Sequence, residues 1–545
     1  MGTYLRKVLG NGCLLAIPGG YLVTKESLNT IAWVLPPESN DWDDSLLHRA
    51  MLALDTANSQ SIARQEVAEA LAAPYETLRD YGVAKQLDAH QYSAVAAMIS
   101  PSLKGMALFD EQGTGKTLCA IISYDILRQK GLLSHLLVIA PKSVLTAWEK
   151  EIQQFLPGKY NVLRVSGSRV DRLKIIGEHD ILLASYEAAA RSKILLQGLM
   201  TTKNRQFMMV IDESYFVKNA GAQRSRAIIS LRQWCKRAYV LCGTPAPNSP
   251  SDIVNQINVT DSGATFNNIR IPKDDDHAKE VIKEALGKSA IYLRRLKEEV
   301  LPDIPNKNIN KTFIELSPIQ ANIYEREVNG LVDDVNKISE PYFLSHLGLF
   351  MARKWALLQI CSHPRVISPD YTEVPAKLLA IDQILHSLVV ERNQKVVIWS
   401  FFTFSLQRIV ERYAHYGVVR IDGTVTSMED RAKAIRLFQS DPSVMVFVGN
   451  PAAAGAGITL TAASNAIFES FSNQPAHYMQ SVDRIHRRGQ IHEVNSFILI
   501  SKNTLEEREF QKLAEKEHRG HGIFENIPRE PVTKEGFLNE LLGHG

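Results

Sequence analysis

The segment Met106-Ala-Leu-Phe-Asp-Glu-Gln-Gly-Thr-Gly-Lys-Thr117 passes from a short apolar run through a glycine-rich loop into a helical pattern. Gly113 and Gly115 let the backbone turn its N–H groups inward, where they can surround phosphate oxygens. Lys116 would reach the β- and γ-phosphates of a nucleotide, and the Thr117 hydroxyl would bind Mg²⁺. The order strand, loop, helix therefore predicts a phosphate-binding loop, although a short match of this kind also arises by chance.

A pair of carboxylates follows a second buried strand roughly 95 residues further along the chain. The apolar run Phe207–Ile211 ends in Asp212 and Glu213. An acid at the tip of such a strand can hold Mg²⁺, and a second acid can orient or deprotonate an attacking water. Acidic pairs after strands are common, but this pair has the order and strand context that a nucleotide-hydrolysing sheet requires.

A third motif, Gln480-Ser-Val-Asp-Arg-Ile-His-Arg-Arg-Gly-Gln490, lies in the second half of the chain. If this segment is helical, Arg484 and Arg487 lie three positions apart on one face. An arginine aimed at a transferring phosphoryl group accelerates its transfer by roughly 10³- to 10⁵-fold. Taken alone, the segment is more typical of an exposed basic helix, and its catalytic interpretation depends on the two motifs above.

The composition is that of a globular protein with more than one domain. Of 545 residues, 45% are hydrophobic and 22% charged, which excludes a disordered, collagen-like or coiled-coil chain. Five scattered cysteines without a C-x-x-C pair support neither a disulfide framework nor a zinc module. No run approaches the roughly 18 apolar residues that span a bilayer, so we expect no membrane partner.

The charge is distributed unevenly along the chain. Residues 81–504 hold 50 basic and 40 acidic residues, whereas both ends are acidic. A basic body between acidic ends fits a polyanionic partner, although an excess of this size is weak support on its own.

Short apolar runs alternate with helical patterns in two halves of the chain, which predicts parallel sheets covered by helices. The fold class is therefore α/β, with residues 1–80 as a small α+β unit, 261–288 as a polar insertion and 318–360 as a helical bridge. Trp148 has helical spacing from other apolar residues, which favours a place in the core over stacking on a nucleotide. The expected strands are Met106–Phe109, Leu136–Ala140, Ile181–Ala184, Phe207–Ile211 and Ala238–Cys242, then Lys395–Ser400, Val418–Asp422, Val444–Val448, Ala466–Phe468 and Val494–Ile500.

These elements, in this order, resemble superfamily 2 helicases, specifically the Swi/Snf-type double-stranded DNA translocases. The loop is similar to the family's D-E-x-G-x-G-K-T element, which accounts for Asp110 where a first glycine is more usual. A dozen motifs in order, covering about residues 85 to 512, are far more specific than any one alone. The other matching segments are Leu87–Gln91, Val138–Trp148, Ile181–Tyr186, Asp212–Asn219, Leu241–Asn248, Tyr292–Val300, Gln359–Pro364, Val397–Ser400, Ile421–Thr424, Ala454–Thr461 and Gln480–Gln490.

The resemblance implies two RecA-like lobes with ATP and Mg²⁺ bound between them and duplex DNA lying across both. We expect an accessory domain at 1–80, a first lobe at 81–305, a helical linker or protrusion at 306–375, a second lobe at 376–510 and a C-terminal tail at 511–545. A helix over 505–518 should pack on the second lobe, and the last stretch of the chain should reach the first.

The resemblance also assigns roles to single residues, with Gln91 reading adenine. For each serine or threonine, a capping or turn role is about as plausible as contact with DNA. Catalysis is assigned to Lys116, Glu213, Arg484 and Arg487, nucleotide binding to Gln91, Gly113, Thr114, Gly115, Lys116, Thr117, Asp212 and Gly457, metal binding to Thr117 and Asp212, and DNA contact to Lys142, Ser143, Ser185, Tyr186, Gly423, Thr424 and Thr459.

Three positions depart from the family pattern. Ser214 replaces alanine or glycine, Tyr215 replaces the histidine that links hydrolysis to DNA contacts, and Ala452 stands where an arginine is usual. Because Tyr215 keeps a hydroxyl, we expect activity to survive. The segment around Ala454–Thr461 looks closer to the annealing-helicase branch than to nucleosome remodellers.

Two other interpretations stay open: a strand-separating or annealing helicase on DNA or RNA, and a nucleic-acid-binding scaffold with weak ATPase activity. Residues 1–80 would recognise a DNA structure, bind a protein partner or brace the first lobe. We expect a monomer of bacterial, archaeal or viral source, located in the cytoplasm with the nucleoid or in a virus-infected cell, or in the nucleus if the source is eukaryotic.

Overall fold

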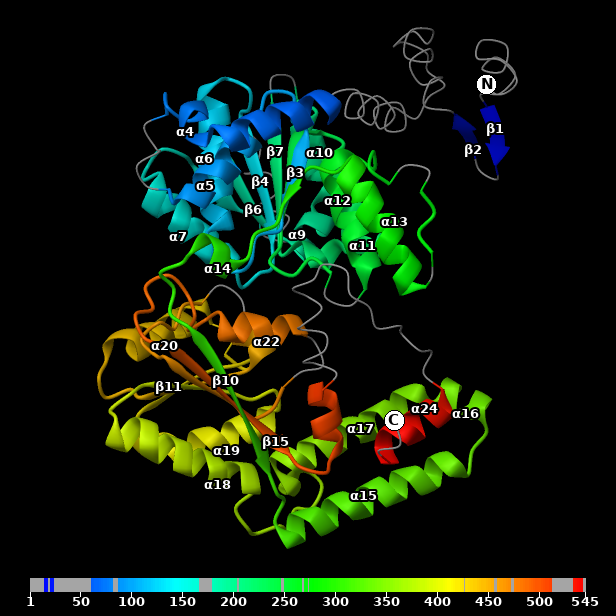
Figure 1. The fold of residues 1–545 in the computed structure, drawn as a ribbon, viewed down its shortest axis with the longest axis vertical. Helices are drawn as coiled ribbons and strands as arrows, with labels where there is room; N and C mark the ends of the chain where they lie inside the picture. The colour runs from blue at the N-terminus through cyan, green and yellow to red at the C-terminus, as the bar shows by residue number, and fades with distance from the viewer. Residues whose placement is uncertain are drawn as a thin grey trace. The chain divides into compact units, whose positions relative to one another are not determined.

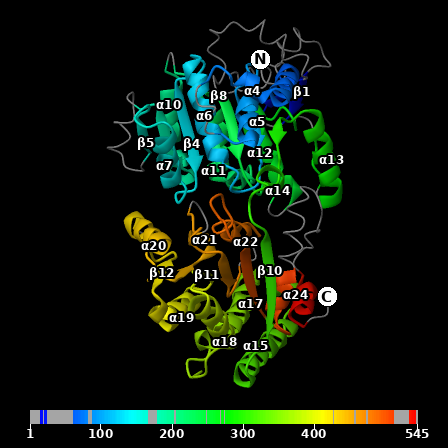
Figure 2. The same cartoon turned by 60° about the vertical axis from the view of Figure 1, so that its left-hand side comes forward.

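A computed structural model of the chain describes residues 14–17, 20–23, 60–81, 87–165, 179–202, 205–246, 249–266, 269–272, 274–425, 427–454, 458–471, 475–511 and 533–542. The chain divides into two compact units, Met1–Leu296 and Lys297–Gly545. Each unit contains a parallel β-sheet with helices packed on it (Figure 1, Figure 2). This confirms the predicted α/β fold with two parallel-sheet lobes.

The sheet of the first unit has seven parallel strands in the order β5-β6-β4-β7-β8-β3-β9. All five strands predicted for this half are present. The two that were not predicted, β5 and β9, are very short and lie at the edges of the sheet. The strands are β3 (Gly105–Leu108), β4 (His135–Ala140), β5 (Val162–Arg164), β6 (Ile181–Ser185), β7 (Phe207–Asp212), β8 (Cys235–Leu241) and β9 (Tyr292–Leu293).

Helices cover both faces of this sheet, which is why the inner strands β3, β6 and β7 are buried along their whole length. Figure 1 shows α5 to α7 on one side and α9 to α13 on the other. The helices are α4 (Pro74–Thr77), α5 (Ala89–Met98), α6 (Lys116–Gln129), α7 (Leu145–Phe155), α9 (Tyr186–Arg191), α10 (Lys193–Met200), α11 (Gln223–Arg232), α12 (Val254–Asp261) and α13 (Asp275–Lys288).

Helix α13 lies within the segment predicted to be a polar insertion. Its buried residues Ala278, Ile282 and Leu286 are four positions apart and form one apolar face. The acidic run that suggested a linker is the N-terminal end of this helix, where the Asp274 carboxylate accepts a hydrogen bond from the backbone N–H of His277.

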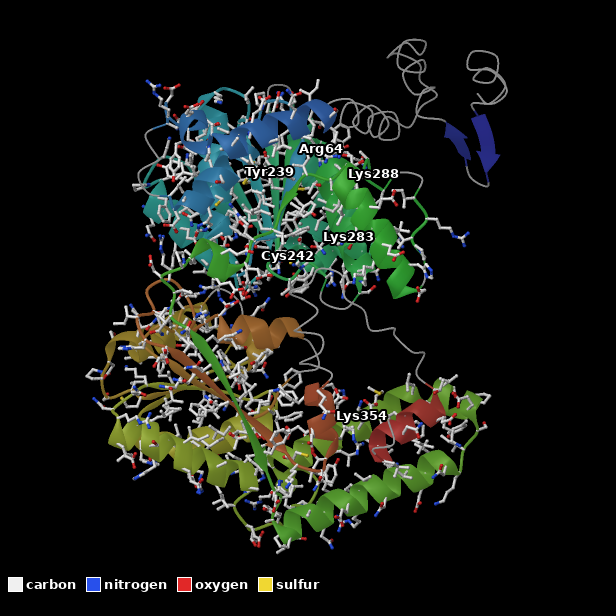
Figure 3. The ribbon with its side chains drawn as sticks, viewed as in Figure 1. Arg64, Tyr239, Cys242, Lys283, Lys288 and Lys354 are labelled. Carbon is white, nitrogen blue, oxygen red and sulfur yellow. The ribbon has the colours of Figure 1, made fainter. Side chains whose placement is uncertain are left out.

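Residues 60–72 form a helix that is tied to the first unit. Gln60 Nε2 donates to the carbonyl of Ser289 at 2.5 Å, and Arg64 donates to that of Gly287 at 2.8 Å (Figure 3). This part of the N-terminal region therefore braces the first unit. Earlier in the chain, β1 (Leu14–Ile17) and β2 (Gly20–Val23) form an antiparallel pair.

The second unit has a six-stranded parallel sheet in the order β10-β15-β14-β11-β13-β12. Alternate residues of β11 enter opposite cores: Val397 and Trp399 on one face, Val396 and Ile398 on the other. All five strands predicted for this half are present. The strands are β10 (Lys307–Ile314), β11 (Val396–Trp399), β12 (Val418–Ile421), β13 (Val446–Gly449), β14 (Asn465–Phe468) and β15 (Val494–Ser501).

Strand β10 was not predicted, because its sequence carries no apolar run and the segment was assigned to a helical linker. It is an edge strand, paired only with β15, and most of its side chains are exposed. The helices of this unit are α14 (Lys297–Val300), α15 (Pro318–Asn336), α16 (Glu340–Ser345), α17 (Leu347–Ser362), α18 (Ala376–Leu385), α19 (Thr403–Tyr413), α20 (Met428–Ser440), α21 (Pro451–Ala454), α22 (Pro475–Val482) and α24 (Lys534–Leu542).

The last described helix packs inside the second unit, and the predicted reach of the last stretch to the first stays a prediction. Phe537 and Leu541 of α24 enter a core built by α15 and α17. Lys354 of α17, labelled in Figure 3, pairs with Glu509 at 2.7 Å and with Glu540 at 2.8 Å. No helix in the described part of the chain is long and apolar enough to cross a membrane.

A buried ion pair fastens α18 to the segment after β15. The ammonium of Lys377, which is 0% exposed, donates to the carboxylate of Glu506 and to the backbone carbonyl of Glu469, each at 2.5 Å. Removing one partner of a buried pair leaves the other charge without compensation.

We therefore predict that Lys377→Met destabilises the second unit by roughly 3–5 kcal/mol, measured by urea unfolding. Lys377→Met combined with Glu506→Gln should recover part of the loss. As a control, Lys288→Ala breaks an exposed pair with Glu284 and should leave unfolding unchanged. Unfolding of Lys377→Met at the same urea concentration as the parent would contradict the assignment.

Candidate functional site

The loop between β3 and α6 closes around the ammonium group of Lys116. Gly113 and Gly115 both have φ of 83°, in the left-handed region that glycine adopts without strain. Lys116 Nζ donates to the backbone carbonyls of Asp110 at 2.8 Å and Glu111 at 3.0 Å. The loop therefore has the curled backbone that the glycine pattern predicts, and Thr117 follows as the second residue of α6.

Two arginines that follow β9 hold this loop from outside. Nε and Nη2 of Arg295 pair with the two oxygens of the Asp110 carboxylate. Arg294 donates to the carbonyls of Phe109 at 2.5 Å and Gly243 at 2.7 Å. This accounts for an aspartate at position 110. Neither arginine was assigned a role from the sequence, although both lie in the matching segment Tyr292–Val300.

Gln91 uses both ends of its amide inside the protein. Its Nε2 donates to the carbonyl of Thr114 at 3.0 Å, and its Oε1 accepts from the N–H of Asp88 at 3.0 Å. His90 Nε2 lies 2.8 Å from the same Thr114 carbonyl. Gln91 thus supports the loop in this conformation, and its predicted contact with adenine stays a prediction.

The acid pair lies at the end of β7, next to the buried indole of Trp148. Trp148 is 0% exposed, as a core residue should be, and its Nε1 donates to Asp212 Oδ2 at 2.9 Å. Asp212 Oδ1 accepts from the N–H of Glu213 at 2.9 Å. Trp148 is therefore a core residue that also holds the predicted metal ligand Asp212 by a hydrogen bond. Helical spacing predicts the first role but not the second.

Electrostatics confirm that the loop lysine and the two acids lie in one neighbourhood. Burial lowers the pKa of Lys116, while the carboxylates of Glu213, Asp110 and Asp212 oppose that shift. Burial raises the pKa of Asp212, against the hydrogen bond from Trp148 and the charge of Lys116. An ammonium group suits phosphate oxygens and a buried carboxylate suits a divalent cation, so the donor set fits a nucleotide with Mg²⁺.

The two departures beside the acids have different surroundings. Ser214 is buried and donates its hydroxyl to Gln256 Oε1 at 2.5 Å, and the Gln256 amide in turn donates to the carbonyl of Pro245. Tyr215 packs against Phe216, with ring centroids 4.7 Å apart. The serine thus ties the acid segment to α12 and to the loop after β8.

The arginine-bearing segment of the second unit is not helical where the sequence suggested. Helix α22 ends at Val482, and residues 483–489 form turns, so the two arginines do not share a helical face. Arg484 is only 2% exposed and donates to the carbonyls of Gln480 at 2.9 Å and Ile458 at 3.3 Å. Arg487 is partly exposed and contacts the Thr459 hydroxyl at 3.2 Å.

Lys297 supports the same turn. It is 3% exposed, and its ammonium pairs with the Asp483 carboxylate and donates to the carbonyl of His486 at 3.2 Å. The His486 ring in turn bonds the carbonyl of Pro305 at 2.8 Å.

The residues predicted to contact DNA fall into two groups. Lys142, Gly423, Thr424 and Thr459 are exposed and Ser143 is partly exposed. In contrast, Ser185 caps α9 by accepting from the N–H of Ala188 at 3.1 Å, and Tyr186 is 1% exposed. Gly457, predicted to contact the nucleotide, lies outside the described residues.

Comparison of the sequence with known families gives two matches. The SNF2-related domain matches residues 32–366 and the helicase conserved C-terminal domain matches residues 376–489. The chain is 26% identical over 496 residues to the ATP-dependent helicase FUN30 of Saccharomyces cerevisiae, covering 74% of this chain and 43% of the relative. It is 29% identical over 426 residues to the human DNA annealing helicase and endonuclease ZRANB3, covering 73% and 36%.

The chain spans less than half the length of these curated relatives. Among solved structures, the Sulfolobus solfataricus SWI2/SNF2 ATPase core in complex with dsDNA is 28% identical, with 80% of this chain and 92% of that chain covered and a TM-score of 0.37. The family conclusion does not depend on that likeness. Because the SNF2-related match covers more than half of the sequence and the helicase match continues it, this chain belongs to the SNF2-related family of helicase-like proteins.

Proposed function

We propose that this chain is a DNA-dependent ATPase that moves along double-stranded DNA and remodels protein–DNA or branched DNA structures. The observation that supports this most directly is the Lys116 ammonium, which the loop carbonyls of Asp110 and Glu111 hold within the electrostatic influence of Asp212 and Glu213. These residues lie at or after the carboxyl ends of parallel strands, and α/β sheets bind their ligands at those ends. Family membership supports ATP as the nucleotide.

In this proposal the loop backbone from Gly113 to Gly115 and the Lys116 ammonium bind the phosphates. Thr117 and Asp212 would hold Mg²⁺, which supplies positive charge beside the β- and γ-phosphates when bound. Glu213 would orient the attacking water and accept its proton.

The two arginines of the second unit have different proposed roles. Arg487 is partly exposed and would stabilise the charge on the transferring phosphoryl group. Arg484 is buried among backbone carbonyls, so we propose that it supports catalysis by holding the segment that contains Ile458 and Thr459. Gly457, in the same stretch, is kept as a proposed nucleotide contact.

DNA would be gripped through its phosphates by the exposed group Lys142, Gly423, Thr424 and Thr459. Contacts to phosphates fix position without reading sequence. A partner for the N-terminal region remains part of the proposal only for residues before 60, since residues 60–72 brace the first unit.

A second candidate use is the annealing of DNA strands. It is favoured by the likeness to ZRANB3, whose name describes an annealing helicase, and by the sequence around Ala454–Thr461. This candidate keeps the same ATPase chemistry and changes only the product on DNA.

We predict that Lys116→Ala and Arg487→Ala each reduce DNA-stimulated ATP hydrolysis by at least roughly 10³-fold while duplex DNA binding is retained. The measurements are a steady-state phosphate-release assay and a DNA-binding titration. Lys130→Ala at the far end of α6 and Arg353→Ala on α17 serve as matched controls that should hydrolyse ATP like the parent. Parent-like hydrolysis in either test variant would refute the assigned role.

We predict that double-stranded DNA stimulates hydrolysis more strongly than single-stranded DNA or RNA of equal length. With about four phosphate contacts, the logarithm of the binding constant should fall with the logarithm of salt concentration at a slope of about −3.5. Equal or stronger stimulation by RNA would favour the rival strand-separating helicase. Binding without any stimulated hydrolysis would favour the scaffold.

A further inference from the structure

Glu213 is held in a backbone conformation that residues other than glycine seldom adopt. Its φ is 52° and its ψ is 53°, in the left-handed region. Its N–H donates to the Asp212 carboxylate at 2.9 Å, and its carbonyl accepts from the Tyr186 hydroxyl at 3.2 Å. The backbone of Glu213 is therefore fixed on both sides, and what remains to be fixed is its carboxylate.

Gln112, in the phosphate loop, reaches that carboxylate. Its Nε2 donates to Glu213 Oε1 at 3.1 Å, and the glutamine is only 7% exposed. Gly243, after β8, makes room for it: a Cβ on Gly243 would lie 2.4 Å from Gln112 Cγ and 3.1 Å from the Gln112 backbone nitrogen. The glutamine is thus confined between a glycine and the acid, with its donor aimed at the acid.

We propose that Gln112 is a positioning residue for hydrolysis, which aims the Glu213 carboxylate at the attacking water. The inference rests on the proposed function, in which Glu213 acts on that water. The phosphate-loop pattern D-E-x-G-x-G-K-T leaves this position open, so the role is specific to the glutamine in this chain. It also connects the loop that holds the phosphates to the acid that acts on the water through one hydrogen bond.

Methionine and glutamate test the role because both match the length of glutamine. Gln112→Met fills the same space without a donor, and Gln112→Glu adds a second negative charge that repels Glu213. A matched control is Gln129→Met, since Gln129 Nε2 also donates to a carboxylate, Asp125 Oδ2 at 2.8 Å, at the other end of α6.

The experiment measures kcat and KM for ATP on the full chain with saturating duplex DNA. We expect Gln112→Met to lower kcat by about 10-fold, and Gln112→Glu by about 100-fold, with KM for ATP within about twofold of the parent, because a hydrogen bond to a charged group is lost. Gln129→Met should behave like the parent. A kcat for Gln112→Met within about twofold of the parent, or a loss seen only in KM, would overturn the proposal.

A crystal structure of Gln112→Met separates this proposal from the proposed function. If the parent does not hydrolyse ATP, or if Glu213→Gln hydrolyses it normally, the proposed function fails whatever Gln112 does. The structures then decide the positioning role by themselves. A Glu213 carboxylate displaced in the variant supports it, and a carboxylate in the parent position overturns it.

Discussion

The burial of charge at the end of the first sheet is the constraint on which the surrounding structure depends. Asp212 is only 8% exposed and Lys116 is partly exposed, and an ion withdrawn from water costs several kcal/mol unless neighbouring groups compensate. The compensation comes from the same loop for Lys116 and from a residue 64 positions away for Asp212. Loop carbonyls receive the ammonium and the Trp148 indole donates to the acid. The motifs must therefore occur together, which is why their joint presence in the sequence is more informative than any one of them.

The sheets could be predicted from sequence because their inner strands are buried on both faces. Runs such as Phe207–Ile211 are apolar throughout, and all ten predicted strands are found. The strands missed are those without such burial. β10 is polar because it lies at an edge, and β5 and β9 are too short to show a pattern. The acidic start of α13 was misinterpreted as a linker because helix caps and linkers share residue types.

The candidate site residues could be predicted where the proposed chemistry requires a particular residue type. The residues that hold them in place could not, because they lie far away in the sequence. The glycine loop, Lys116 and the acid pair followed from local pattern. The pairing of Arg295 with Asp110 joins positions 185 apart, and no local spacing indicates it. The spacing of the two arginines predicted that they share one helical face. Helix α22 ends before both of them, and the Arg484 side chain is buried, where it donates to the carbonyl of Gln480.

The short segment at the boundary between the units shows how each motif keeps its own geometry. Arg294 and Arg295 close the first unit and anchor its phosphate loop. Lys297 opens the second unit and anchors the turn that carries Arg487. Since each anchor lies inside the unit it serves, the phosphate loop and the arginine-bearing turn are shaped locally, whatever the arrangement of the two units. Under the proposed function, a hydrolysis cycle that changes that arrangement would therefore not have to rebuild either motif.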